Sequence, residues 1–215
     1  MMRRMVLQMC LTGLLIMGAT GCAYTVPLTP IEADAIPALH DTKVPGQFSA
    51  LIATEDCCKK EVRSELLMCQ APTYYVNGQQ AVEASLRTAL PAVFEDVVVG
   101  QSNRVNGLTF TVERFDVSVR FDPLGVVPMV HATADVGVAV EAQHNGQIVM
   151  KGHAYAQQAN VGRVVLFCAE ASSTIAEAVN TATREALSKL AELLANSATI
   201  RNMAGPSPNK QAQVQ

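Results

Sequence analysis

Residues 130–142 alternate between apolar and polar or small side chains without a break, and no other feature of the chain constrains its fold as strongly. The even positions are all valine or alanine, while the odd positions include His131, Asp135 and Glu141. A period of two is the pattern of a β-strand with one buried and one exposed face. The even phase continues from Ile148 to Ala156, so this segment predicts a β-hairpin whose even positions face the core.

The connection between the two strands of this hairpin is expected to be a three-residue loop. If the even positions of both strands face the core, opposed positions must add up to an even number. A two-residue turn at Asn145-Gly146 gives an odd sum, whereas a loop of residues 144–146 sets Val140 opposite Met150. Such loops favour glycine in the left-handed conformation, which we assign to Gly146.

Residues 108–121 also read as a strand, but their alternation changes phase once. Leu108, Phe110 and Val112 occupy even positions, whereas the later apolar residues are odd: Phe115, Val117, Val119 and Phe121. One extra residue near Glu113-Arg114 would restore a single buried face, and a β-bulge inserts one. The alternative is a strand that is covered on both faces.

Two long helices are expected beside these strands. Residues 76–94 carry apolar side chains at helical spacing, with Pro91 near the end of the segment. Residues 175–196 carry an alanine-rich apolar stripe that suits close packing on a sheet. Thr174 followed by Glu177 predicts a capping box at the start of this second helix.

Shorter apolar segments predict two further strands, at residues 47–54 and 94–99. Residues 55–75 form a cysteine-bearing insertion, in which we expect a short helix around residues 60–68. The order of these elements predicts an α+β fold, with an antiparallel sheet of about four strands and two long helices packed on one face. The folded domain is expected to span residues 47–200.

The first 22 residues have the organisation of an export signal. Arg3 and Arg4 precede an apolar run at residues 5–18, which is too short to span a bilayer, and small residues then lead to Cys22. This pattern resembles the lipobox of bacterial lipoproteins, in which the signal is removed before the cysteine and the cysteine carries acyl chains. The alternative is an ordinary secretory signal that is cut near Gly21 or Ala23.

The lipobox implies a lipid-anchored domain organisation. Residues 1–21 would be the signal peptide, and the proline-rich residues 22–46 an extended tether. Residues 201–215 read as a disordered tail. By resemblance to lipoprotein sorting in enterobacteria, Ala23 after Cys22 favours the periplasmic face of the outer membrane.

The net charge of the chain argues against a main partner that is bound through an extended basic face. The net charge is −3, and removal of residues 1–21, which contain Arg3 and Arg4 and no acidic residue, makes it −5. Nucleic acids and anionic lipid headgroups as main partners require a basic face. Aromatic residues make up 5% of the chain and tryptophan is absent, so a stacking platform for bases or sugars is not evident either.

The four cysteines after Cys22 fit an oxidising compartment, and all are disulfide candidates: Cys57, Cys58, Cys69 and Cys168. Adjacent cysteines make a poor disulfide because the ring that they close is strained. A bond from Cys69 to either Cys57 or Cys58 is therefore favoured, with Cys168 bonded to the remaining cysteine or buried. No histidine stands at ligand spacing beside them, so no metal site is expected.

No nucleophile, phosphate-binding or dinucleotide-binding motif is present, so neither an enzyme nor a cofactor is expected. Asp116, Asp122 and Asp135 are candidate acids, but two of them lie on alternating strands and read as solvent-facing residues. The sequence places no two carboxylates together. The serines and threonine at residues 172–174 are better explained by helix capping than by nucleophilic catalysis.

The segments ADVGVAVEAQHNGQIVMKGHAYA (134–156) and STIAEAVNTATREALSKLAELL (173–194) resemble the carboxy-terminal half of YajG-like bacterial lipoproteins. The lipopolysaccharide-assembly lipoprotein LptE and the auxiliary lipoproteins of lipid-exporting ABC transporters are similar in outline. The insertion at residues 55–75 departs from the YajG-like pattern, and the family has no catalytic residues to carry over.

Two functions follow as expectations. The first is a non-enzymatic lipoprotein, anchored through Cys22, that binds protein partners of a cell-envelope assembly, with a homo-oligomer as a further form of association. The alternative is a lipid-handling or transport-auxiliary lipoprotein that encloses an acyl chain between the sheet and the helices. A closed core between these layers favours the first function, and a large apolar groove favours the second.

Overall fold

A computed structural model describes residues 23–33, 43–54, 57–63, 72–100, 104–122, 128–164 and 168–203. Its larger sheet contains β2 (Val44–Ala53), β5 (Phe94–Val99), β6 (Asn106–Asp122), β7 (Met129–His144) and β8 (Gln147–Arg163). Its smaller sheet contains β1 (Ala23–Thr25), β3 (Lys59–Arg63) and β4 (Thr73–Asn77). The described helices are α2 (Gln79–Val93), α3 (Ala171–Asn196), α4 (Ala198–Met203) and the short 3-10 helix η2 (Cys168–Glu170).

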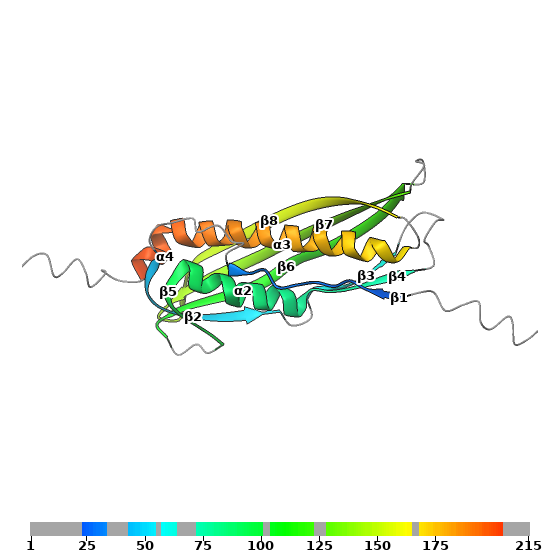
Figure 1. Cartoon of the computed structure of the whole chain (residues 1–215). Helices are drawn as coiled ribbons and strands as arrows, with labels where there is room; N and C mark the ends of the chain where they lie inside the picture. Colours follow the sequence, from blue (N-terminus) through cyan, green and yellow to red (C-terminus); the bar gives the residue numbers. More distant parts are fainter. Residues whose placement is uncertain are drawn as a thin grey trace, which may run out of the picture.

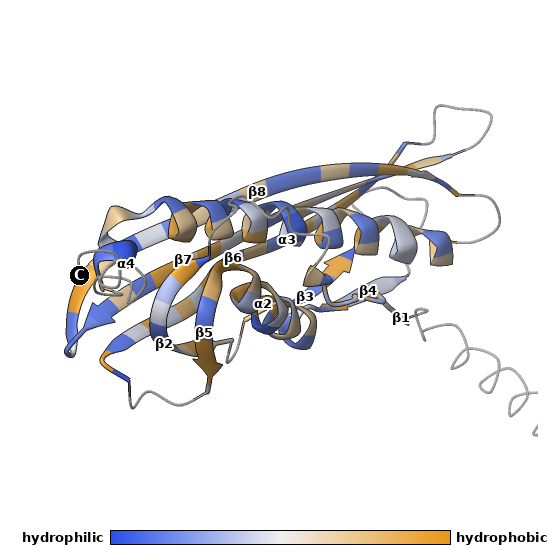
Figure 2. Cartoon of the chain, turned by 60° about the vertical axis from the view of Figure 1, so that its left-hand side comes forward, coloured by the Kyte–Doolittle hydropathy of each residue, from blue (hydrophilic) through white to orange (hydrophobic). Residues whose placement is uncertain are grey.

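The five strands of the larger sheet lie in the order β5-β2-β6-β7-β8. Both α2 and α3 lie on one face of this sheet (Figure 1) and contact each other. Hydrophobic and hydrophilic stretches alternate along α3 (Figure 2), as expected of a helix with one buried face. The opposite face of the sheet carries no helix among the described residues, and we call it the uncovered face.

The prediction of an α+β fold with both helices on one face is confirmed, but the prediction of a four-stranded antiparallel sheet is wrong. There are eight described strands in two sheets, and β2 runs parallel to both of its neighbours, β5 and β6. The chain reaches β5 from β2 through α2, and a helical crossover of this kind joins parallel strands. Only the pairs β6–β7 and β7–β8 of the larger sheet are antiparallel among the described strands.

The predicted β-bulge in β6 is confirmed. Val112 pairs with Val138 and Arg114 pairs with Gly137, so Glu113 is the extra residue. Before the bulge the even positions of β6 face the helices, and after it the odd positions do. The bulge thereby keeps all the large apolar residues of this 17-residue strand on one face.

The even positions of β7 are buried as predicted, but the predicted connection to β8 is wrong. The turn has two residues, Asn145 and Gly146, with φ values of +52° and +77°. Val140 pairs with Gly152 rather than with Met150. A register irregularity beside Ala142 restores the even phase that a two-residue turn alone would lose. An irregularity in the strand pairing, instead of a longer loop, therefore keeps the even positions of both strands on the same face.

The smaller sheet lies where the sequence predicted a helix and a tether. Residues 59–63 form β3, which pairs antiparallel with β4, and β1 pairs parallel with β4. Val26 and Ile31, which follow β1, are 3% and 4% exposed, so this part of the expected tether packs into the domain. The remaining predictions, for the helix at residues 64–68, the insertion up to residue 71 and the tether at residues 34–42, lie outside the described residues.

The helix α3 packs closely on β7 and β8 because its buried stripe is rich in alanine. A Cβ atom added to Gly152 would lie 2.9 Å from Cδ2 of Leu193, and one added to Gly162 would lie 3.3 Å from Cβ of Thr174. The predicted capping box is wrong, because α3 begins before Thr174 and that threonine is buried inside the helix.

The chain remains helical beyond the predicted end of the domain. Ile200 and Met203 of α4 are buried, so the expected disordered tail begins no earlier than residue 204, and residues 204–215 lie outside the described residues. None of the described helices combines the length and the apolar character that crossing a membrane requires.

Candidate functional site

The β-bulge in β6 brings polar side chains together on the uncovered face of the sheet. Glu113 and Arg114 are adjacent in sequence and both are exposed there. His153 and Tyr155 occupy successive exposed positions of β8, while Asp135 lies on β7 between the two strands. We call these five residues, with Gly137 beneath them, the Tyr155 patch.

Glu113 is the centre of the Tyr155 patch. The hydroxyl group of Tyr155 donates a hydrogen bond to Oε2 of Glu113 at 2.7 Å. Nδ1 of His153 lies 2.8 Å from the same oxygen atom. The rings of His153 and Tyr155 are stacked, with centroids 6.1 Å apart and planes inclined by 4°. One carboxylate therefore fixes the orientation of both rings.

The ring of Tyr155 packs directly against the backbone of Gly137. A Cβ atom at this position would lie 2.5 Å from Cε1 of Tyr155 and 3.2 Å from Cβ of Arg114. Next to the ring, Nη1 of Arg114 contacts Oδ2 of Asp135 at 2.9 Å. Tyr155 is 45% exposed, yet contacts on its edge and its face hold it in place. Such an exposed and oriented tyrosine is suited to recognition.

The electrostatics of the Tyr155 patch oppose proton transfer. The hydrogen bonds from Tyr155 and, secondly, His153 lower the pKa of Glu113 below its usual value of 4.5. The same hydrogen bond to Glu113 raises the pKa of Tyr155 above 10.0. At neutral pH Glu113 is therefore an anion and Tyr155 a neutral phenol, with each pKa displaced away from neutrality. General acid–base catalysis favours groups with pKa values near the working pH.

The sequence did not place two carboxylates together, but the structure does. Asp116 lies directly opposite Asp135 on the neighbouring strand. Each is ion-paired, Asp116 with Lys60 at 2.8 Å and Asp135 with Arg114 at 2.9 Å. The hydrogen bond from Lys60 lowers the pKa of Asp116, so this carboxylate is no proton donor. Asp122, the third acidic residue considered, lies near the end of β6 away from this pair.

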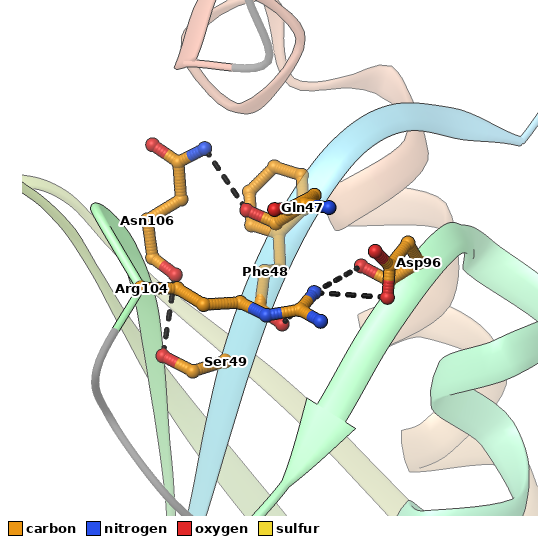
Figure 3. A network of polar contacts seen from close by, with 6 residues as sticks. All are labelled: Gln47, Phe48, Ser49, Asp96, Arg104 and Asn106. Atoms are coloured by element: carbon orange, nitrogen blue, oxygen red, sulfur yellow. Dashed lines mark hydrogen bonds and ion pairs between the residues drawn. The ribbon is translucent and has the colours of Figure 1, made fainter.

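A second polar network links β2 and β5 to Arg104 and to Asn106 at the start of β6 (Figure 3). Nη1 of Arg104 donates to Oδ1 of Asp96 at 2.9 Å and to the carbonyl oxygen of Phe48 at 3.1 Å. Oδ1 of Asn106 lies 2.8 Å from Nδ1 of His144. Because these groups hydrogen-bond one another and the backbone, the network stabilises the sheet and offers few free groups to a ligand.

The cysteines are paired differently from the prediction. Cys57 and Cys58 form a disulfide with each other, with their Cα atoms 3.8 Å apart. Cys58 has a φ of +68°, and its carbonyl oxygen accepts a hydrogen bond from the backbone N–H of Gly78 at 2.7 Å. The surrounding fold thus holds the unusual backbone that was thought to exclude an adjacent pair, and the preference for Cys69 as the partner of Cys57 or Cys58 is wrong.

The remaining cysteine predictions concern Cys168, Cys69 and Cys22. Cys168 is also disulfide-bonded, so it is not a free thiol. Cys69 and the predicted lipidation site Cys22 lie outside the described residues. The part of the chain that the structure describes contains no group of three or more histidine, cysteine, aspartate or glutamate residues able to hold a metal ion.

The hydroxyl groups at the start of α3 are engaged by the backbone. Oγ of Ser172 donates to the carbonyl oxygen of Ala169, and Oγ of Ser173 donates to that of Glu170, both at 2.7 Å. These bonds stabilise the junction of η2 and α3 and leave no nucleophile beside a base. None of Glu113, His153 and Tyr155 was predicted as a site residue from the sequence, although the bulge predicted near Glu113 and the odd phase of β8 would have placed them on one face.

Comparison with known proteins gives weak structural likenesses. No protein-family model and no curated protein matches the chain. A DUF330 protein from Xanthomonas campestris is 16% identical, with 89% of this chain and 98% of that chain covered and a TM-score of 0.45. A minor lipoprotein from Acinetobacter baumannii is 11% identical, with 78% and 100% covered and a TM-score of 0.37. With TM-scores below 0.5, these likenesses carry none of the proposals below.

Proposed function

We propose that this chain is a non-enzymatic, lipid-anchored lipoprotein of the cell envelope that binds a protein partner through the Tyr155 patch. The observation that carries the proposal is Tyr155 itself, a half-exposed aromatic side chain held by Glu113 and Gly137 on a face without a covering helix. Aromatic side chains with one apolar face and a polar tip are frequent anchors of protein interfaces. Arg114, Asp135 and His153 supply a polar rim around this anchor.

The packing between α3 and the sheet disfavours the alternative of an enclosed acyl chain. An alanine stripe, with Ala182 and Ala186 fully buried, lies against β7 and β8. Gly152 and Gly162 have no room for one additional carbon atom against Leu193 and Thr174. An acyl chain would have to separate these layers, whereas a partner on the uncovered face requires no rearrangement of the core.

A comparison of two tyrosines tests partner binding. Tyr155→Ala removes the anchor from the larger sheet, and Tyr75→Ala removes a tyrosine of similar exposure, 43%, from β4. We expect a partner recovered from detergent-solubilised membranes with the parent protein, identified by mass spectrometry, to persist with Tyr75→Ala and to be lost with Tyr155→Ala. Equal recovery with both variants would contradict the assignment of the Tyr155 patch.

The lipid anchor is tested separately at Cys22. We expect Cys22→Ser to abolish metabolic labelling with a radioactive fatty acid, because the lipid is attached through the cysteine sulfur. Fractionation of the labelled parent would show whether the anchor lies in the outer membrane, as Ala23 suggests. Equal labelling of the variant and the parent would leave an ordinary secretory signal as the better interpretation.

A further inference from the structure

A second site lies on the uncovered face, between the Tyr155 patch and the end of the sheet where β6 ends and β7 begins. It is a pocket of about 460 Å³, within the range of small-molecule sites. Two facing residue pairs form its base: Ser118 opposite Thr133 and Arg120 opposite His131. Directly opposed side chains have Cβ atoms only about 5 Å apart, so their polar ends can converge on one small ligand.

The guanidinium group of Arg120 has no neutralising partner among the described residues. Two other cations of the larger sheet are ion-paired, Arg114 with Asp135 and Lys151 with Glu141. Arg120, by contrast, lines the pocket without a hydrogen bond or ion pair in the described part of the chain. Asp122 is the acidic residue of the lining, and it already has an interaction of its own.

The donor set of the pocket matches an oxyanion. A planar guanidinium group can donate two parallel hydrogen bonds to two oxygen atoms of a phosphate group. The hydroxyl groups of Ser118 and Thr133 and one ring N–H of His131 add three more donors. We propose that this pocket binds a phosphate-type oxyanion, either free or as the headgroup of a phospholipid.

The position of the pocket favours a phospholipid headgroup over a free oxyanion. The end of β6 and the start of β7 lie at the same end of the molecule as β1 (Figures 1 and 2). Because β1 begins at Ala23, directly after Cys22, this end would face the membrane if Cys22 carries the lipid. The preference for a lipid headgroup therefore rests on the proposed anchoring, whereas oxyanion binding itself does not.

The test is an isothermal calorimetric titration of the mature protein in a non-ionic detergent at constant ionic strength. Three compounds serve as probes: inorganic phosphate, dihexanoyl phosphatidic acid and dihexanoyl phosphatidylcholine. Arg120→Gln is compared with Arg184→Gln, which removes the same charge from an exposed position on α3. Thermal melts of both variants should match the parent, because neither side chain has a described ion-pair partner.

We expect saturable binding of phosphatidic acid to the parent and to Arg184→Gln, and binding at least about tenfold weaker to Arg120→Gln because the paired guanidinium bonds are lost. Saturable binding of inorganic phosphate with the same dependence on Arg120 would support the oxyanion site and identify free phosphate as a ligand. Binding that is absent, equal in the two variants, or equally strong for phosphatidylcholine would overturn the proposal.

Discussion

The two sheets of this protein are specified in different ways. The larger sheet has strands of up to 17 residues, whose alternation fixes the buried face over many consecutive positions. The strands of the smaller sheet have three to five residues, too few for a period of two to stand out from chance. The sequence of a long strand thus determines which of its faces is buried, whereas the position of a short strand depends on contacts with the rest of the molecule.

The contacts that hold the smaller sheet are individual and specific. The side chain of Tyr74 on β4 is fully buried, and its hydroxyl group donates to the carbonyl oxygen of Cys168 at 2.5 Å. Lys60 on β3 forms an ion pair with Asp116 on β6. The ring of Phe115 packs against Gly78, where a Cβ atom would lie 2.7 Å from Cζ. A few such contacts replace the extended apolar face of the larger sheet.

The largest expected difference between the two sheets concerns their buried apolar residues. Phe110→Ala in β6 should lower the free energy of unfolding by about 3–5 kcal/mol, because Phe110 is fully buried and leaves a cavity. Val62→Ala in β3 should cost about 1–2 kcal/mol, since it removes less buried surface. Urea denaturation measures both. An equal loss would show that the smaller sheet is as important to stability as the larger one.

The next test concerns the β7–β8 turn, which depends on backbone conformation alone. Gly146 has a φ of +77°, and the space around it is open, so Gly146→Val should cost about 1–2 kcal/mol or more through backbone strain. Gln147→Val, at the exposed next position, should be nearly neutral. Thermal melts of the two variants decide the matter, and a larger loss from Gln147→Val would mean that the turn is placed wrongly.

The parts of the fold that were predicted correctly from the sequence are mostly those in which a regular apolar pattern extends over many residues. The bulge at Glu113 and both helices were predicted because apolar spacing persisted over several turns or residue pairs, whereas the strand at residues 94–99 was predicted from its short run of apolar and β-branched residues. The parallel pairing of β2 was not predicted, because alternation within a strand does not reveal the direction of its neighbours. The β3 strand was mistaken for a helix because five residues offer no decisive pattern.

The candidate sites were also predictable from the sequence only in part. The uncovered face followed from the phase of β7, but the meeting of Glu113 with Tyr155 depends on how β6, β7 and β8 are aligned. That alignment includes a register irregularity beside Ala142, which no residue type in the sequence predicts. The disulfide between Cys57 and Cys58 was rejected on local strain, and only the surrounding fold shows that the backbone accepts it.

A smaller effect is expected at Tyr74, where the smaller sheet meets η2. Tyr74→Phe should lower stability by about 1 kcal/mol through the lost hydrogen bond to Cys168. Burial, and secondly the nearby Tyr24, raise the pKa of Tyr74 from 10.0 to about 12. The folded state therefore favours the protonated phenol, and the stability that it contributes is complete below pH 10 and is lost as the pH rises towards 12.

Measurement of this effect requires unfolding curves of the parent and of Tyr74→Phe over the alkaline range. The difference between the two proteins should be constant up to about pH 10 and should shrink above it. Tyr75→Phe, at an exposed position of the same strand, serves as the control. A difference that is independent of pH would show that Tyr74 does not titrate with the raised pKa.

The smallest expected effect lies in the Tyr155 patch and concerns protonation more than stability. Because Tyr155 and His153 donate to Glu113, its pKa is lowered, and the stability that this carboxylate contributes is present above 4.5 and lost as the pH falls through the lowered value. Tyr155→Phe removes the first of these donors, so the pKa of Glu113 should rise towards 4.5, as carbon-detected NMR titration of its carboxyl group would show. Glu185 on α3, whose pKa is lowered by hydrogen bonds from Lys189 and, secondly, Gln158, should titrate identically in both proteins. An unchanged titration of Glu113 would mean that Tyr155 is not held by this hydrogen bond in solution, and the oriented anchor on the larger sheet would lose its physical basis.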